Sequence, residues 1–189
     1  GMLSATSKRF PDRPEALSRA RHVHVGEGYS RESRQGIVND PTQRRRRAVF
    51  FRQIFDEKLA QYAYVVGCQR TGEALVIDPE RDIDRYLTLV EEEDLTITAV
   101  AETHIHADFL SGAREFAERF DVHLFLSDEG DEDWKYEWVK EGDYDYTLLR
   151  HKDTFRVGEI EVEAVHTPGH TPEHLSFLVT DRGGGAGEP

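Results

Sequence analysis

The sequence predicts an α+β domain built around a mixed sheet, and three observations support this prediction. Short β-branched and aromatic runs occur at 49–55, 60–67 and 73–79, with turn residues between them. Further along the chain, strand-like runs alternate with two stretches of helical periodicity. The length of 189 residues is sufficient for one domain with a substantial core.

Each element follows from its local pattern. Gln69–Gly72 predicts a hairpin turn between the second and third strands. A helix is expected over 82–93, because its apolar residues share one face and Asp82 suits the N-cap position. The acidic stretch 128–146 is interpreted as a solvated lid or insertion. The other predicted elements are a strand at 96–103, a helix at 111–120, a strand at 122–127, a strand near 147–150, a hairpin over 154–166 and a strand at 174–180.

Charge divides the chain into two parts. Residues 1–47 hold 11 Lys and Arg against 5 Asp and Glu, a net of +6, and residues 48–189 carry −19, which gives the overall −13. We expect a basic flexible arm over 1–47, a folded domain over 48–181 and a flexible Gly-rich tail over 182–189. For the arm, an organelle presequence or a partner-binding segment is the alternative.

Composition excludes several classes of function. The acidic domain would repel phosphate groups, so no nucleic-acid partner is expected. No run of 18 apolar residues occurs, so no membrane span is expected. Cys68 is the single cysteine, which rules out an intrachain disulfide and favours a reducing, cytoplasmic location.

The stretch THIHADFLSG (103–112) carries metal-capable side chains after a predicted strand. Open α/β sheets bind ligands at this end of their strands. Alternate spacing can aim His104 and His106 into one space, and Asp108 can join them or hold an imidazole by a hydrogen bond. Gly112 would allow the next helix to begin in close contact with its neighbours. Imidazoles and a carboxylate are ligands that suit zinc or iron.

A second histidine-rich turn, HTPGHTPEH (166–174), follows another predicted strand. Pro168-Gly169 forms a tight turn that could aim His170 sharply. His166 and His174 are interpreted as donors that stabilise this turn. Because both histidine-rich turns follow strands, together they predict a metal site.

These two motifs resemble those of the metallo-β-lactamase superfamily, and most closely its glyoxalase II and persulfide dioxygenase branch, whose bacterial form often carries rhodanese domains. The resemblance extends over 49–180. It implies a four-layer αβ/βα fold with a metal between the two sheets. It also implies that His104, His106, Asp108 and His170 form the metal site, with Asp108 as a catalytic residue.

Two departures from the family pattern refine this expectation. The family motif His-x-His-x-Asp-His ends in a histidine that binds the second metal of hydrolytic members, and this chain has Phe109 there. The resemblance therefore implies a site for one metal. A further family aspartate lies roughly 20 residues after the Pro-Gly-His turn, whereas Asp181 follows His170 by only 11. We accordingly expect only the first lobe of the fold, with weak metal binding and little activity by itself.

The resemblance implies an iron(II) persulfide dioxygenase that converts glutathione persulfide and O₂ into sulfite and glutathione. A zinc-dependent thioesterase of the glyoxalase II type is the alternative, and a non-catalytic binding lobe is a third. The expected partners are a small glutathione-like thiol or persulfide, and a second copy of the chain that covers the exposed sheet.

Overall fold

The computed structural model describes residues 49–183, so the predicted arm over 1–47 and most of the predicted tail lie outside the described residues. None of the helices within this range is long and apolar enough to cross a membrane. In chain order, the elements are β1 (Val49–Asp56), β2 (Gln61–Cys68), β3 (Glu73–Ile77), α2 (Asp84–Glu92), β4 (Thr96–Ala101), α3 (Ala113–Arg119), β5 (His123–Ser127), the 3-10 helix η1 (Glu137–Lys140), β6 (Tyr146–Leu149), β7 (Thr154–Val157), β8 (Ile160–His166) and β9 (Leu175–Asp181).

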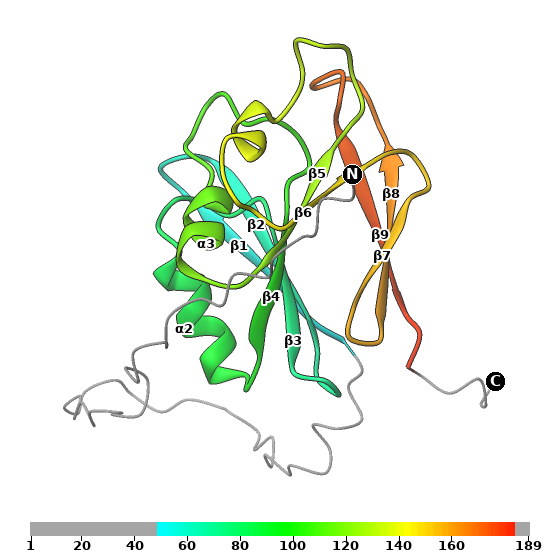
Figure 1. Ribbon diagram of the computed structural model, residues 1–189. Helices are drawn as coiled ribbons and strands as arrows, with labels where there is room; N and C mark the ends of the chain where they lie inside the picture. Colours follow the sequence, from blue (N-terminus) through cyan, green and yellow to red (C-terminus); the bar gives the residue numbers. More distant parts are fainter. Residues whose placement is uncertain (1–48, 184–189) are drawn as a thin grey trace, which may run out of the picture. The chain divides into compact units, whose positions relative to one another are not determined.

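The strands form two sheets. The larger sheet has the order β1-β2-β3-β4-β5-β6 and the smaller one the order β7-β8-β9. Pairing is antiparallel from β1 to β3, parallel from β3 to β6, and antiparallel throughout the small sheet. Figure 1 shows α2 and α3 on one face of the large sheet and the small sheet on its other face. The α+β class is confirmed, and three of the four expected layers are present within residues 49–183.

Strand alternation divides the interior into two cores on either side of the large sheet. In β3, Ala74 and Val76 belong to the core under the helices, whereas Leu75 and Ile77 belong to the core between the sheets. Successive side chains of a strand point to opposite faces, so one apolar run supplies both cores. Full burial of each such aliphatic side chain contributes about 1.5–3 kcal/mol.

The start of α2 corrects the predicted cap. The N-cap residue is Ile83, without a side-chain cap, so the assignment of Asp82 to this position was wrong. Ile83 is 1% exposed and lies in the core under the helices. Apolar packing, and not a capping hydrogen bond, therefore determines where this helix begins.

The acidic stretch before β6 packs against the domain. Tyr136 and Val139 of this stretch lie in the core under the helices. Asp128 forms ion pairs with Lys135 of the same stretch at 3.3 Å and with Arg150, just after β6, at 2.6 Å. The segment therefore contributes buried side chains, in addition to its solvated acidic ones.

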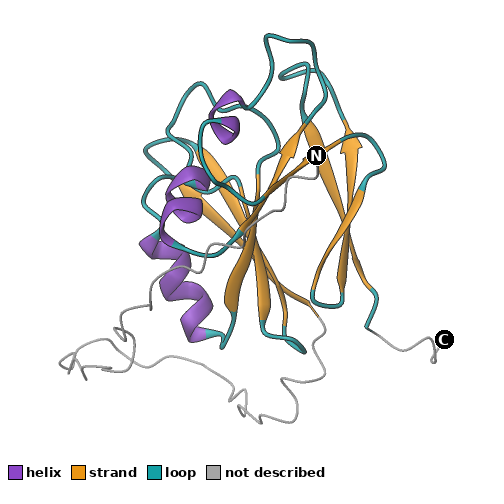
Figure 2. Cartoon of the chain, viewed as in Figure 1, coloured by secondary structure: helices purple, strands orange, loops and turns teal. Residues whose placement is uncertain are grey.

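The connections after β4, β5 and β8 gather at one end of the two sheets, where Figure 2 draws them in teal. The close approach predicted at Gly112 is confirmed there. Its N–H donates to the Pro79 carbonyl at 2.7 Å, and a Cβ at this position would collide with the Glu80 carbonyl. Both predicted histidine-rich turns belong to this end of the fold.

Candidate metal centre

Asp78 fixes the first histidine-rich turn to the end of the neighbouring strand. It directly follows β3, is 5% exposed, and has a φ of 51°. Its Oδ1 accepts the Thr103 N–H at 2.7 Å, and its Oδ2 accepts the Thr103 hydroxyl at 2.7 Å. The start of the 103–112 turn is therefore held by a buried carboxylate 25 residues earlier in the chain.

The second turn is joined directly to the first. The Leu175 N–H donates to the Thr103 carbonyl at 2.7 Å. The Ile105 N–H donates to Oε1 of Glu173 at 2.8 Å, and Glu173 is fully buried. These bonds join the two predicted motifs, one of which follows a strand of the large sheet and the other a strand of the small sheet.

Four imidazole rings cluster where the turns meet. The ring centroid of His104 lies 4.2 Å from that of His106, 4.7 Å from that of His170 and 5.2 Å from that of His174. The structure thus places His104, His106 and His170 side by side. It adds His174, which the sequence analysis treated only as a turn-stabilising donor. His166 lies apart from the four rings, and its Nε2 bonds to the Pro172 carbonyl at 2.7 Å.

Asp78 also determines which nitrogen of two histidines is available to a ligand. The Thr103 hydroxyl donates its proton to Asp78, so Thr103 Oγ1 accepts from Nδ1 of His104 at 2.8 Å. Nε2 of His106 donates to Asp78 Oδ1 at 3.1 Å. When both rings are neutral, these bonds leave the lone pairs on Nε2 of His104 and on Nδ1 of His106, because a neutral imidazole carries a proton on one nitrogen only.

The pKa values of the clustered histidines are shifted in different directions. Burial, followed by the charges of His106, His170 and His174, lowers the pKa of His104 to about 4, against the opposing effect of Asp78. Burial also lowers the pKa of His174. For His106, burial acts to lower the pKa, but the hydrogen bond and charge of Asp78 outweigh it and raise the pKa. His104 is therefore neutral at physiological pH, which is the protonation state that binds metals.

Asp108 and Phe109 lie in the same turn but outside the imidazole cluster. The Asp108 carboxylate is exposed, and its negative charge contributes to the raised pKa of His106. The ring of Phe109 packs on His106 with a centroid separation of 4.4 Å. An apolar ring thus occupies the space beside His106 at the motif position that differs from the family pattern.

The donor chemistry fits a metal ion, since neutral imidazoles suit zinc or iron(II). Within residues 49–183, however, no three His, Cys, Asp or Glu side chains are already placed to share one ion. The rings are gathered, but their nitrogen atoms do not converge on one point. The ligand set of His104, His106, His170 and Asp108 therefore remains a prediction.

Sequence reasoning missed Asp78 and Glu173. The available signal was indirect: Asp78 follows an apolar strand at once, and Glu173 is a charged residue within a histidine-rich turn. Neither pattern by itself indicates a buried carboxylate that holds a neighbouring turn.

Comparison with known proteins agrees with this geometry. Residues 57–184 match the family model of the metallo-beta-lactamase superfamily. A metallo-beta-lactamase structure from Staphylococcus aureus is 47% identical with a TM-score of 0.69, covering 74% of this chain and 40% of that one. The ETHE1 structure from Myxococcus xanthus is 34% identical with a TM-score of 0.59, covering 69% of this chain and 53% of that one.

The curated relatives include proteins named as persulfide dioxygenases and proteins named as hydroxyacylglutathione hydrolases. The mitochondrial persulfide dioxygenase ETHE1 of Bos taurus is 28% identical over 137 residues, which is 70% of this chain and 49% of that protein. A probable hydroxyacylglutathione hydrolase of Schizosaccharomyces pombe is 26% identical over 120 residues, which is 61% of this chain and 42% of that protein. The chain spans about half the length of the curated relatives that it matches.

Proposed function

The chain belongs to the metallo-β-lactamase superfamily, and from this premise we propose that its histidine cluster holds a single iron(II) ion for persulfide oxidation. The proposed reaction converts glutathione persulfide, O₂ and water into glutathione, sulfite and two protons. His104, His106 and His170 would hold the ion, with Asp108 as the carboxylate of the same turn. A bound ferrous ion would supply adjacent open positions for a sulfur and for O₂.

One observation carries the choice of a single metal: Phe109 packs on His106, with 4.4 Å between the ring centroids. This ring occupies the motif position whose histidine binds the second metal in hydrolytic members of the family. A phenyl ring offers no ligand atom, and it keeps water from that side of His106. The relatives named as persulfide dioxygenases support persulfide oxidation as the reaction.

The residues around the cluster prepare it for binding. Asp78 holds His104 through the Thr103 hydroxyl and holds His106 directly. Each ring is thereby kept in the tautomer that leaves one lone pair for a ligand. Glu173 fixes the backbone of Ile105 between them. Such supporting hydrogen bonds commonly change metal affinity by roughly 10–100-fold.

Metal content and activity together test this proposal. The protein is purified without oxygen and analysed for iron and zinc, and O₂ consumption is then followed with glutathione persulfide. We expect iron to support slow but measurable O₂ consumption, and His170→Ala to reduce both iron content and rate. The matched control is His123→Ala, because His123 lies on β5 and bonds to Thr147, outside the two turns.

A zinc-dependent thioesterase is the second candidate, supported by the relatives named as hydroxyacylglutathione hydrolases. In that case zinc would activate a water for attack on a thioester carbonyl. The test is whether the zinc-loaded protein hydrolyses S-lactoylglutathione. If it does, and the iron-loaded protein does not oxidise persulfide, the second proposal replaces the first. Inactivity of both forms would favour a binding lobe.

A further inference from the structure

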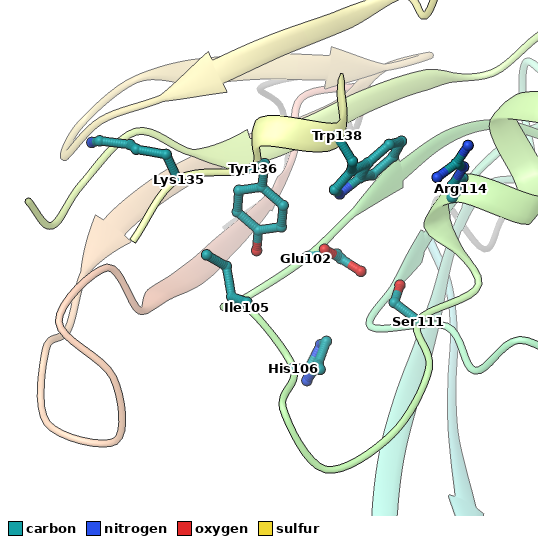
Figure 3. Close-up of a pocket in the computed structure, with 8 residues that line it drawn as sticks. All are labelled: Glu102, Ile105, His106, Ser111, Arg114, Lys135, Tyr136 and Trp138. Atoms are coloured by element: carbon teal, nitrogen blue, oxygen red, sulfur yellow. The ribbon is translucent and has the colours of Figure 1, made fainter. Parts of the chain in front are cut away.

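A cavity of about 300 Å³ lies behind the first histidine-rich turn. Its lining comes from the 102–111 segment, from α3 and from the stretch that contains η1. Figure 3 shows the residues that determine its chemistry: Glu102, Ile105, Ser111, Arg114, Tyr136 and Trp138.

The inner part of this cavity holds two polar groups that the described fold does not satisfy. Glu102 is 3% exposed and Tyr136 is 5% exposed. Within residues 49–183, neither Oε1 of Glu102 nor the Tyr136 hydroxyl makes a well-formed hydrogen bond. Burial raises the pKa of Glu102 to about 7, against the opposing effects of the nearby Ser111 and Tyr136 hydroxyls. Figure 3 shows the Tyr136 hydroxyl and the Ser111 hydroxyl both directed toward the Glu102 carboxyl. Each unsatisfied buried group costs about 1–3 kcal/mol, so a fold that keeps two of them facing one cavity indicates a missing partner.

The side chains that line the cavity and its opening restrict which kind of ligand can bind there. Trp138 and Tyr136 present aromatic rings to the cavity (Figure 3). The Lys135 ammonium is not available there, because its Nζ donates to the carbonyls of the 128–130 segment. Arg114 lines the cavity with a side chain that is 57% exposed, and its Nε donates to Glu118. Its terminal nitrogens are further donors of the guanidinium group.

We propose that this cavity binds a small organic ammonium of the amino-acid class. Its ammonium group donates to Oε1 of Glu102 and to the Tyr136 hydroxyl, and its apolar body lies against Trp138. A carboxyl acceptor beside aromatic rings is the combination that binds organic ammonium groups. Arg114 at the mouth matches the carboxylate of the same ligand through charge-assisted hydrogen bonds.

The volume restricts the ligand to a small molecule, since pockets for drug-sized ligands begin at about 300 Å³. This proposal extends beyond the proposed function, because no metal or persulfide enters into it. His106 lines this cavity and also belongs to the histidine cluster, so the chelator arm of the experiment below separates the two sites.

Three probes that share a two-carbon unit ending in a methyl group separate the contributions of the two charged groups to binding: alanine, ethylammonium and propionate. Each is titrated calorimetrically into the full chain, as purified and again with a chelator that prevents amine–metal contacts. We expect alanine to bind most tightly, ethylammonium more weakly and propionate not at all. Quenching or enhancement of tryptophan fluorescence should accompany binding, because Trp138 lines the cavity.

Variants locate the site. Glu102→Gln should weaken alanine and ethylammonium by roughly tenfold or more, as expected when a hydrogen bond to a charged group is lost. Arg114→Gln should abolish the advantage of alanine over ethylammonium. Arg119→Gln is its matched control, because Arg119 is on the same helix, pairs with Glu115 and does not line the cavity. Tyr136→Phe serves as a second test of the inner wall if the Glu102 variant melts at a much lower temperature.

Two results would overturn the proposal. If none of the three probes binds at millimolar concentrations, the cavity holds water alone. If propionate binds most tightly, the site recognises anions through Arg114, and Glu102 is not the acceptor that we describe.

Discussion

Asp78 organises the candidate centre from outside the histidine motifs. One buried carboxylate accepts three hydrogen bonds, from the Thr103 N–H, the Thr103 hydroxyl and His106. Two of these bonds determine the tautomers of His104 and His106. A change at Asp78 should therefore affect both rings at once, although Asp78 itself is not among the proposed ligands.

We predict that Asp78→Asn weakens zinc binding by roughly 10–100-fold, the usual effect of losing such a supporting group. Asparagine tolerates the positive φ of this position, so the backbone should persist. Competition with a chromophoric chelator measures the affinity. Asp82→Asn is the control, because Asp82 is exposed and lies four residues further on. Equal affinities for the two variants would show that Asp78 does not orient the rings.

Single residues of the site differ in how far sequence could predict them. His104, His106 and His170 were predictable, because each sits in a short motif directly after a strand. Asp78 and Glu173 were not, because their partners are 25 and 68 residues away in the chain. Local patterns carry no information about such contacts, which exist only after both sheets have formed.

Strands were easier to predict than helix ends. Each strand within residues 49–183 coincides with a predicted strand or hairpin. Burial on both faces explains the continuous apolar runs of the central strands of the large sheet, and alternation explains the strands of the small sheet. The start of α2 was misplaced, since a capping preference worth about 1 kcal/mol was outweighed by the burial of Ile83, which is 1% exposed. The acidic stretch before β6 was predicted as solvated, and the burial of Tyr136 within it became visible only from the fold.

The ion pairs of Asp128, at the start of this acidic stretch, lead to a prediction about pH. Burial acts to raise the pKa of Asp128, but its bonds to Arg150 and Lys135 outweigh burial and lower the pKa. A lowered folded pKa stabilises the protein above the unfolded pKa, and this contribution is lost as pH falls through the folded value. Asp128→Asn should therefore reduce the free energy of unfolding by about 1 kcal/mol at neutral pH, and by less below the ordinary value of 3.8.

Urea unfolding at several pH values measures this difference. Asp143→Asn is the matched control, because Asp143 is an exposed carboxylate of the same stretch. A loss for Asp128→Asn that stays constant down to acidic pH would contradict the assignment of its stabilising effect to the charged carboxylate.

The β1–β2 hairpin leaves an aromatic surface uncovered. Phe51 is 60% exposed, Phe55 46% and Tyr62 44%. Phe51 pairs in register with Val66, which belongs to the core between the sheets, so this surface continues that core. Exposed apolar surface of this kind commonly marks an association site.

We predict that the chain self-associates through this face. Phe51→Ser combined with Phe55→Ser should shift sedimentation equilibrium toward monomer with little change in unfolding free energy, because both rings are already exposed. Leu178→Ser is the control, since Leu178 is 57% exposed but pairs with Glu163 on the outer face of the small sheet. A wild-type chain that is monomeric at every concentration would contradict the prediction.

At the scale of the whole molecule, the described domain supplies a scaffold and an imidazole cluster but only part of what its relatives contain. The chain covers 42–54% of the length of the first four curated relatives. Within residues 49–183, no three ligand side chains are ready to share an ion. A facial-triad oxygenase also needs a carboxylate among its ligands, with adjacent positions open.

We therefore predict that this chain alone consumes O₂ with glutathione persulfide only slowly, even with iron supplied. A version extended to the length of the curated relatives should gain activity, because added chain can cover the aromatic face and provide a further carboxylate. The two proteins are compared by O₂ electrode at equal iron content, with His170→Ala in the extended version expected to remove the gain. If the short chain matches the extended one, the exposed Asp108 and the three histidines already form a complete site, and side-chain rotation alone would bring their donor atoms together.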